Sequence, residues 1–304
     1  MNRTLRVFQV DAFSRVPFAG NPAGVVLDAQ GLDAAQMQAI ARELGQGDTA
    51  FVLPAVDATH DLQLRFFTPR AEAGFVGHAT LAAHAVLASL GLPEQPRQWQ
   101  RTGLVTIERI AAGDGARFAF CQPPPPLQGA PDPAWFADAL AALGLQADEL
   151  DQRLSPMVAG SASTRALIAL RDARRLASLQ PDLARLAALS ARGAPPGFFC
   201  YAVHGDGDGL RTEARMHCPA LGIPEDPVSG NAHAMLAHRL SVAGLLDANA
   251  PCVRFAGEQG GPMGRPGFVH VEVENADGRP QRIRIAGAAT IVWEARLRLP
   301  GQPA

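Results

Sequence analysis

The feature that most constrains the fold is an internal repeat, because two halves of the chain carry the same short motifs in the same order. Arg65–Pro69 is followed by a short loop and by Val76–Ala79, which opens a helix rich in Ala and Leu. Arg215–Pro219 is followed by a loop three residues longer and by Ser229–Ala232, which opens a second such helix. Matches of this kind predict a duplicated fold.

A second pair of motifs lies upstream in each half. Ala19–Ala23 precedes one apolar strand, and Ala159–Ser163 precedes another at Ala166–Leu170. Each of the two helices is expected to end near a glycine, Gly91 in the first half and Gly244 in the second. Two ordered matches in both halves favour duplication over chance and predict two homologous α+β lobes.

Length and composition agree with two lobes. The chain has 304 residues, about twice the usual length of a domain, and its residues are 47% hydrophobic, enough for a sizeable core. We expect an N-terminal lobe at 1–122, completed by 290–304, and a C-terminal lobe at 123–289. The proline-rich stretch Gln122–Pro126 joins them.

The charge balance argues against large charged partners. Lys and Arg number 27 and Asp and Glu number 29, so the net charge is −2, and no basic block stands out. This pattern disfavours nucleic acid and anionic membranes as partners. No apolar run is long enough for a membrane span, and the N-terminus has no apolar leader, so we expect a cytoplasmic protein that binds a small molecule.

Metal and redox chemistry have no signature in the sequence. The cysteines Cys121, Cys200, Cys218 and Cys252 include no CxxC pair, so we expect free core thiols. The histidines form no HExxH motif or similar ligand spacing. P-loop and GxSxG motifs are absent, and Gly257–Gly264 does not sit between a strand and a Rossmann helix. We therefore expect no metal and no cofactor.

Many Gly and Pro residues, 30 and 25, indicate short elements joined by turns. The clearest helix begins at Asp33, forms a capping box with Gln36, and ends at Gly45. Apolar runs predict strands at Leu5–Val10, Val25–Leu27, Ala50–Leu53, Leu62–Phe67, Phe118–Phe120, Ala166–Leu170, Phe198–Val203, Phe268–Val273 and Thr290–Trp293.

The two repeated helix starts are the first candidate binding elements. Gly77-His78 and Gly230-Asn231 each begin a helix, where free backbone N–H groups and the helix dipole favour an anion such as a carboxylate. If a pseudo-twofold axis relates the lobes, both turns point into the cleft between them and hold one carboxylate from two sides. The alternative is that both glycines are only turn residues.

Three titratable residues lie beside these turns. Asp48 follows the first capped helix, and Asp226 precedes the second repeated helix by one short turn. His78 stands at a helix start, where the dipole disfavours its cationic form and where it can donate a hydrogen bond or move a proton. The plainer alternatives are that both aspartates are turn or cap residues and that His78 is a buried structural histidine.

Taken together, these motifs resemble the PhzF-like family, named for the isomerase of phenazine biosynthesis, over nearly the whole chain. The segments that carry the resemblance are Val10–Phe13, Pro17–Pro22, Met37–Leu44, Asp48–Val52, Phe67–Pro69, Phe75–His78, Glu225–Gly230 and Gly264–Gly267. The resemblance implies a diaminopimelate-epimerase-like α+β fold. In that fold two pseudo-twofold-related lobes each wrap a curled, mostly antiparallel sheet around a central helix. It also implies a cofactor-free active site between the lobes and a homodimer.

The wider fold includes racemases and epimerases with two facing cysteines, one directly before each helix start. Those positions are Val76 and Ser229 here, which disfavours a two-thiol racemase. The PhzF-like resemblance instead maps the site to Asp48, Gly77-His78 and Asp226. The chain departs from the family pattern at Gly47-Asp48-Thr49, where Ser-Glu-Thr is usual, so the carboxylate reaches roughly 1.5 Å less far. It also departs at Asn231 and Ala79, where the family commonly has Ser and Pro.

The sequence hypothesis is a cofactor-independent isomerase, with a biosynthetic role, that shifts a proton on a small carboxylate-bearing, amino-acid-like or cyclic substrate. Asp48 acts as general base and returns the proton, while His78 and Asp226 orient the substrate. The substrate carboxylate is held by Asn21, Gly77, Gly230 and Asn231.

Three alternatives stay open: a catalytically silent ligand-binding protein on the same scaffold, a racemase or dehydratase of an amino acid or hydroxyproline, and a metal hydrolase. The shorter reach of Asp48 favours the first.

Overall fold

The computed structural model describes residues 3–113, 115–161 and 163–299. Its chain divides into unit 1, with Met1–Cys121 and Ala286–Ala304, and unit 2, with Gln122–Ile285. Residues 300–304, which we expected to help complete the N-terminal lobe, and Ala162 of the upstream motif lie outside the described residues.

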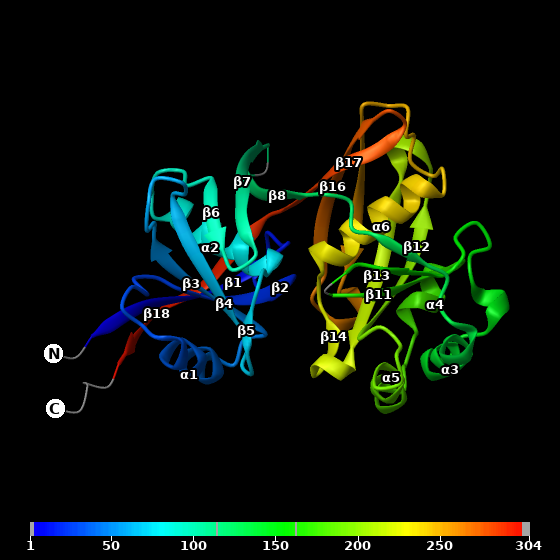
Figure 1. Cartoon of the computed structure of the whole chain (residues 1–304), viewed down its shortest axis with the longest axis horizontal. Coiled ribbons are helices and arrows are strands. Elements are labelled where there is room, and N and C mark those ends of the chain that lie inside the picture. Colours follow the sequence, from blue (N-terminus) through cyan, green and yellow to red (C-terminus); the bar gives the residue numbers. More distant parts are fainter. Residues whose placement is uncertain (1–2, 114, 162, 300–304) are drawn as a thin grey trace. The chain divides into compact units, whose positions relative to one another are not determined.

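Unit 1 consists mainly of strands together with two helices (Figure 1). Its strands are β1 (Thr4–Ala12), β2 (Asn21–Val26), β3 (Asp48–Pro54), β4 (Leu62–Phe67), β5 (Glu72–Ala73), β6 (Arg97–Gln100), β7 (Gly103–Ala112), β8 (Gly115–Gln122) and β18 (Ala289–Arg298). Its helices are α1 (Ala34–Leu44) and α2 (Gly77–Ser89).

Unit 2 contains the remaining elements. Its strands are β9 (Leu127–Gly129), β10 (Met157–Ala159), β11 (Arg165–Leu170), β12 (Gly197–His204), β13 (Arg211–Cys218), β14 (Ile223–Asp226), β15 (Cys252–Gln259), β16 (Gly267–Ala276) and β17 (Arg279–Gly287). Its helices are α3 (Pro133–Leu143), α4 (Ala173–Ala177), α5 (Leu183–Ser190) and α6 (Gly230–Val242), with 3-10 turns at Ala147–Glu149, Gly207–Gly209, Pro219–Leu221 and Gly261–Met263.

The strand pairings of the two units follow the same order. In unit 1, β1–β2, β3–β4, β4–β5 and β6–β7 pair antiparallel, whereas β2–β3 and β4–β6 pair parallel. In unit 2, β10–β11, β12–β13, β13–β14 and β15–β16 pair antiparallel, whereas β11–β12 and β13–β15 pair parallel. This repeat confirms the predicted duplication, and the mixed, mostly antiparallel pairing confirms the α+β class.

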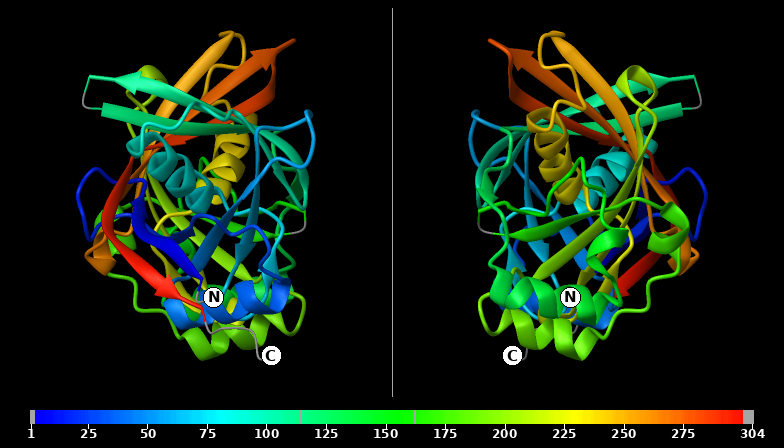
Figure 2. Two further views of the ribbon diagram at one scale, coloured as in Figure 1. Left: turned by 90° about the vertical axis from the view of Figure 1, so that its left-hand side faces the viewer. Right: turned by 90° about the vertical axis from the view of Figure 1, so that its right-hand side faces the viewer.

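Each unit encloses one helix of 13 residues that starts at a repeated Gly-polar motif. Helix α2 contacts β1, β2, β3 and β18, and it is buried without interruption from Ala79 to Leu87. Helix α6 is buried on most of its surface from Ala232 to Ser241. Because Ala and Leu cover all sides of such a helix, it is stable only when it is enclosed. Figure 2 shows both helices, α2 in teal and α6 in yellow, among the strands.

Helix α1 has the predicted ends. Asp33 accepts a hydrogen bond from the Gln36 N–H, the Gln36 side chain accepts one from the Asp33 N–H, and Gly45 closes the helix in the left-handed region at φ 65°. Met37 and Ile40 are buried in the core of unit 1. No helix in the described part of the chain is long and apolar enough to cross a membrane.

All nine apolar runs predicted as strands lie in strands, although their bounds differ by up to several residues. The cysteine prediction was only partly correct. None of the four cysteines forms a disulfide in the part of the chain that the structure describes, but only Cys200 and Cys218 are buried. Cys121 and Cys252 are half-buried, because each lies near the end of a strand, in β8 and β15.

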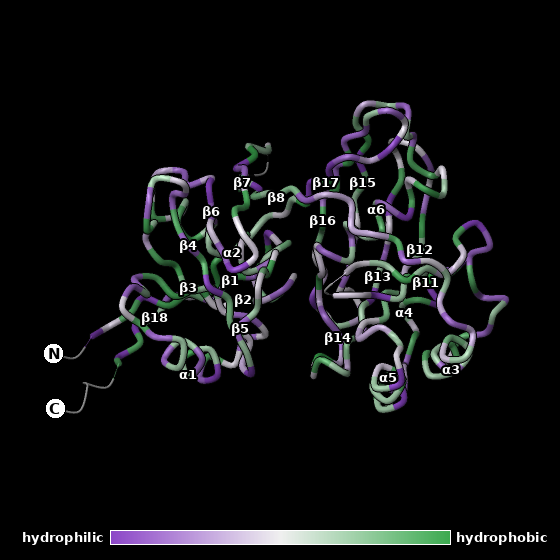
Figure 3. Tube along the Cα trace, in the orientation of Figure 1, coloured by the Kyte–Doolittle hydropathy of each residue, from purple (hydrophilic) through white to green (hydrophobic). Residues whose placement is uncertain are grey.

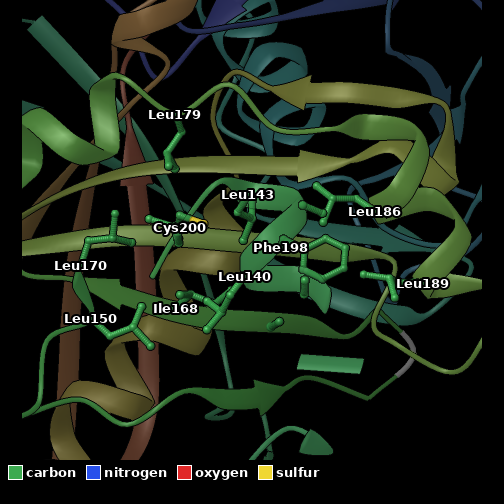
Figure 4. Close-up of a cluster of buried hydrophobic side chains, with 14 of the residues drawn as sticks. Leu140, Leu143, Leu150, Ile168, Leu170, Leu179, Leu186, Leu189, Phe198 and Cys200 are labelled. Atoms are coloured by element: carbon green, nitrogen blue, oxygen red, sulfur yellow. The ribbon is translucent and has the colours of Figure 1, made fainter. Parts of the chain in front are cut away.

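The apolar core of unit 2 shows how its outer helices attach. Figure 4 shows Leu140 and Leu143 of α3 and Leu186 and Leu189 of α5 beside Phe198 of β12. Along the strands of both units, hydrophobic and hydrophilic residues alternate in short runs (Figure 3). Alternation of this kind is typical of strands with one buried face.

A bidentate Arg–Glu pair is repeated in both units. Arg65 on β4 donates from Nε and Nη2 to Glu72 at 2.8 and 2.9 Å, and Arg215 on β13 donates from the same atoms to Glu225 at 2.8 Å each. Side-chain exposure is 25% and 24% in unit 1 but only 8% and 15% in unit 2. Arg215 Nη1 also donates to three carbonyl oxygens at the end of α4, on Leu176, Ala177 and Leu179.

The two pairs therefore predict unequal losses of stability. Arg215→Met leaves a buried carboxylate and three carbonyls without a donor, so we expect it to lower the free energy of unfolding by about 3–5 kcal/mol. Arg65→Met breaks the more exposed pair and should cost about 1 kcal/mol or less. Urea unfolding of both variants checks this prediction, and equal losses would contradict it.

Buried histidines on the two central helices predict a loss of stability in acid. Burial lowers the pKa of His84 and of His233 to about 4, although Gln98 opposes the shift at His84. The unfolded chain, with pKa values near 6.5, binds more protons between these two values. The two histidines therefore do not lower the free energy of unfolding above pH 6.5. As pH falls toward 4 this free energy decreases, and the decrease approaches on the order of 3 kcal/mol per histidine.

Urea midpoints measured from pH 7.5 to pH 5 check this prediction. We expect a steady fall in wild type and a shallower fall in His84→Gln, which removes one titrating group. Midpoints that stay constant over this range in wild type would show that the two imidazoles are not held neutral.

Candidate active site

The end of α1 and the start of β3 position Asp48. The chain leaves α1 through Gly45 and enters β3 at Asp48, which lies opposite Ala23 in the parallel β2–β3 pair. The next residue, Thr49, is fully buried. Asp48 therefore stands at the point where a buried strand begins, with its side chain 17% exposed.

His78 lies in the first turn of α2, the part of that helix that is not fully buried. Val76 is the N-cap residue and has no side-chain hydrogen bond to the turn, and its carbonyl accepts from the Thr80 N–H at 3.0 Å. Apolar Val76 cannot satisfy the free N–H groups of the first turn. This helix start therefore has no side-chain cap, and anion binding there stays a prediction.

The Asp48 and His78 side chains lie close together. The distance from His78 Nε2 to Asp48 Oδ2 is 3.6 Å, and the side chains are 12% and 17% exposed. Burial lowers the pKa of His78 to about 4, so its ring is neutral near pH 7. Nε2 is buried and has no hydrogen-bond partner among the described residues. The pair is a carboxylate beside a neutral imidazole and not an ion pair at neutral pH.

The other two predicted binding residues of unit 1 lie in tightly packed backbone. Asn21 is buried at the start of β2, and it follows Gly20, which has φ 67° and no room for a side chain beside the Ala12 carbonyl. Gly77 opens α2, where a Cβ would lie 2.8 Å from Cζ of Phe120. Phe120 was not among the predicted site residues, because nothing in an apolar strand indicates which ring meets a distant glycine.

Unit 2 holds Asp226, Gly230 and Asn231 around the start of α6. Asp226 Oδ1 accepts from the Val228 N–H at 3.2 Å, and the Asp226 carbonyl accepts from Gln259 Nε2 at 2.6 Å. The first of these contacts also fits the plainer interpretation of Asp226 as a turn residue. Gly230 is buried and Asn231 is half-buried in the first turn.

The start of α6 differs from that of α2 in its cap. Ser229 Oγ accepts from the Ala232 N–H at 3.2 Å, so this helix has a side-chain cap that α2 lacks. The Ser229 N–H in turn donates to Gln259 Oε1 at 3.1 Å. Gln259 therefore holds the segment from Asp226 to Ser229 in place, a role that its isolated position in the sequence did not indicate.

No cluster of three or more His, Cys, Asp or Glu side chains that could hold a metal ion occurs within residues 3–113, 115–161 and 163–299.

Comparison with known proteins shows the family. A family model described as phenazine biosynthesis-like protein (PhzC-PhzF) matches residues 10–295. The chain belongs to this family. The uncharacterized isomerase YddE of Escherichia coli K12 is 38% identical over 296 residues, covering 95% of this chain and 97% of that protein. With relatives of this similarity named isomerases, the chain is an isomerase of the PhzF family.

Three further similarities, two to solved structures and one to a curated relative, agree with this family and its fold. A phenazine biosynthesis protein of the PhzF family from Bacillus anthracis matches with a TM-score of 0.84 at 25% identity, over 97% of this chain and 99% of that one. A hydroxyproline epimerase from Agrobacterium vitis matches with a TM-score of 0.62 at 14% identity, over 99% and 95%, which shows the shared fold. Trans-2,3-dihydro-3-hydroxyanthranilate isomerase of Pseudomonas fluorescens is 29% identical over 284 residues, covering 91% and 94%.

The contact between Gly77 and Phe120 predicts a specific coupling. Gly77→Ala places a methyl group against the Phe120 ring, and we expect a loss of about 1–3 kcal/mol in unfolding free energy. Phe120→Leu removes the crowding atoms, so Gly77→Ala should cost much less in that background. A double-mutant cycle by urea unfolding measures the coupling, and strictly additive losses would contradict the contact.

Proposed function

We propose that this isomerase moves a proton between two carbon atoms of a small carboxylate-bearing substrate, with Asp48 as both proton acceptor and proton donor. The observation that carries the proposal is the accessible Asp48 carboxylate facing a neutral His78 at an uncapped helix start. A neutral imidazole does not hold the carboxylate in an ion pair, whereas an imidazolium would favour its charged form and weaken it as a base.

The proton balance of the proposed step is simple. Asp48 takes a proton from a C–H bond, the electron pair of that bond forms a new double bond, and the existing double bond shifts by one carbon. The carboxylic acid then returns the proton at the far carbon, which restores the carboxylate. One carboxylate suffices because the proton leaves and returns on one face.

His78 supports this step without a charge. A neutral ring presents one N–H and one lone pair, and Nε2 is left without a partner beside Asp48. We assign to it a hydrogen bond to the substrate group on which negative charge develops. Asn21 and Gly77 are proposed to hold the substrate carboxylate near the first turn of α2. The role predicted for Asp226 in orienting the substrate, and that predicted for Gly230 and Asn231 in holding its carboxylate, stay predictions.

The relative from Pseudomonas fluorescens narrows the substrate class. Its name describes an isomerase of a cyclic, unsaturated amino carboxylic acid. Such a molecule has an acidic C–H bond next to a double bond, which the proposed proton shift requires. We therefore place cyclic amino or hydroxy acids with a ring double bond first among candidate substrates, ahead of saturated amino acids.

Deuterium incorporation tests the proposal. Wild type, Asp48→Asn and Asp48→Glu are incubated in D2O with small amino acids, hydroxy acids and dihydroanthranilate-like acids, and products are analysed by mass spectrometry. We expect Asp48→Asn to lower the exchange rate by about 10²–10⁴-fold while ligand affinity is retained. Asp48→Glu keeps the carboxylate and should keep measurable exchange.

Asp57→Asn is the matched control, because Asp57 is an exposed loop aspartate of the same unit. It should exchange at the wild-type rate. Wild-type exchange in Asp48→Asn would reject the role of Asp48. Silence of wild type over the whole panel, with binding still detected by thermal shift, would instead favour a ligand-binding protein, the alternative suggested by the short reach of Asp48.

A further inference from the structure

Arg165, the first residue of β11, is a buried cation that forms no salt bridge with any residue that the structure describes. The residue is 8% exposed, and its hydrogen bond in the described structure runs from Nη1 to the carbonyl of its neighbour Thr164 at 2.8 Å. Nε is buried and has no partner among the described residues. By contrast, Arg65 and Arg215 use Nε and Nη2 to bind a glutamate.

The duplicated register shows which position Arg165 occupies. In unit 1, Ala23 of β2 lies opposite Asp48 of β3, and in unit 2, Arg165 of β11 lies opposite Gly197 of β12. Both Asp48 and Gly197 are the first residues of strands that pair in the same way with their neighbours. Gly197 therefore stands in unit 2 where the proposed base Asp48 stands in unit 1.

The Arg165 side chain fills the space that a side chain at Gly197 would take. A Cβ at residue 197 would lie 2.6 Å from Arg165 Nε and 2.9 Å from Cys218 Sγ, and it would also clash with Arg165 Cδ. The duplication thus places a guanidinium in unit 2 at the position that carries a carboxylate in unit 1.

Cys218 and Asp226 complete the surroundings of Arg165. The pKa of the Cys218 thiol is raised to about 12, mainly by burial, while the charge of Arg165 opposes the shift and that of Asp226 adds to it. The thiol is therefore neutral and supplies no counter-ion. The cluster consists of one cation, one aspartate that also supports the turn before α6, and one uncharged sulfur.

An unpaired buried guanidinium is costly in a folded protein, because desolvation is not offset by a partner. An anionic ligand would offset this cost. We propose that Arg165 is an anion-binding residue of unit 2 and that its ligand is a carboxylate. A monovalent carboxylate fits better than a phosphate, because the nearby Asp226 repels a divalent anion, and guanidinium and carboxylate pair well in geometry.

Thermal unfolding with matched probes tests this proposal. Acetate, benzoate and anthranilate are compared with acetamide, benzamide and anthranilamide at constant ionic strength. We expect at least one acid, and not its amide, to raise the Tm of wild type by roughly 2–4 °C near saturation. Arg165→Met should lose this response, and its Tm without ligand should equal or exceed that of wild type because a buried charge is removed.

Two further variants sharpen the comparison. Arg185→Met removes an exposed arginine from α5 of the same unit and should keep the full response to the acid. Gly197→Ala keeps the charge but displaces the guanidinium, so it should weaken the response without removing the cation. The proposal is overturned if no acid stabilises wild type, if Arg165→Met responds as wild type does, or if Arg165→Met without ligand loses several degrees of Tm.

This test is independent of the proton-transfer experiment. Asp48→Asn should keep the acid-dependent rise in Tm, because Arg165 is untouched. A failure of Asp48→Asn to lower exchange, together with a lost response in Arg165→Met, would reject the proposed function of Asp48 and leave the anion site of Arg165 standing.

Discussion

Burial of a central helix on all its sides determines where each unit can carry chemistry. Helix α2 is closed in by strands from Ala79 to Leu87, so its backbone and side chains are unavailable to a ligand over that length. Its first turn is the exception, and the four N–H groups of a helix start require acceptors from outside the helix. The fold therefore directs both the helix dipole and His78 toward one end of the unit, where Asp48 begins its strand.

The two units share their strand pairings but differ in the residues at the helix and strand starts. Both units keep the strand pairings and the bidentate Arg–Glu pair, which tie β4 to β5 and β13 to β14. At the repeated helix starts, however, Val76 corresponds to a capping serine, and His78 corresponds to an asparagine. The strand start that carries Asp48 in one unit carries Gly197 in the other, with an arginine over it. Such differences at equivalent positions indicate two halves that have taken on different tasks.

The sequence predicted the central elements well for physical reasons. The capping box of α1, the Gly-polar starts of α2 and α6, and the apolar strands each leave a local pattern, and all are present. Strands β7, β13, β15 and β17 were among those missed, because charged residues interrupt their apolar runs, and most of the other missed strands have only two to four residues. Helices α3 and α5 were missed because their apolar stripes are short.

The site was predicted in part. The family resemblance assigned Asp48 and His78 to one site, and both lie at element boundaries that the sequence marks, but it did not predict how near the two side chains lie to each other. The side-chain cap on α6 could have been predicted, because Ser229 directly precedes the helix. The buried, unpaired state of Arg165 could not have been predicted, because an arginine at a strand start is usually exposed. Its burial depends on the small size of Gly197 on the neighbouring strand.

The proposed chemistry depends on the neutral imidazole beside Asp48, because an imidazolium would form an ion pair with the carboxylate. The most direct measurement is an NMR titration of the ring nitrogens of ¹⁵N-histidine-labelled protein, with His78→Gln to identify the signals of His78. The account predicts that His78 stays neutral through the physiological range and titrates near pH 4. A midpoint at or above 6.5, the ordinary value, would show an imidazolium paired with Asp48 and would contradict the account.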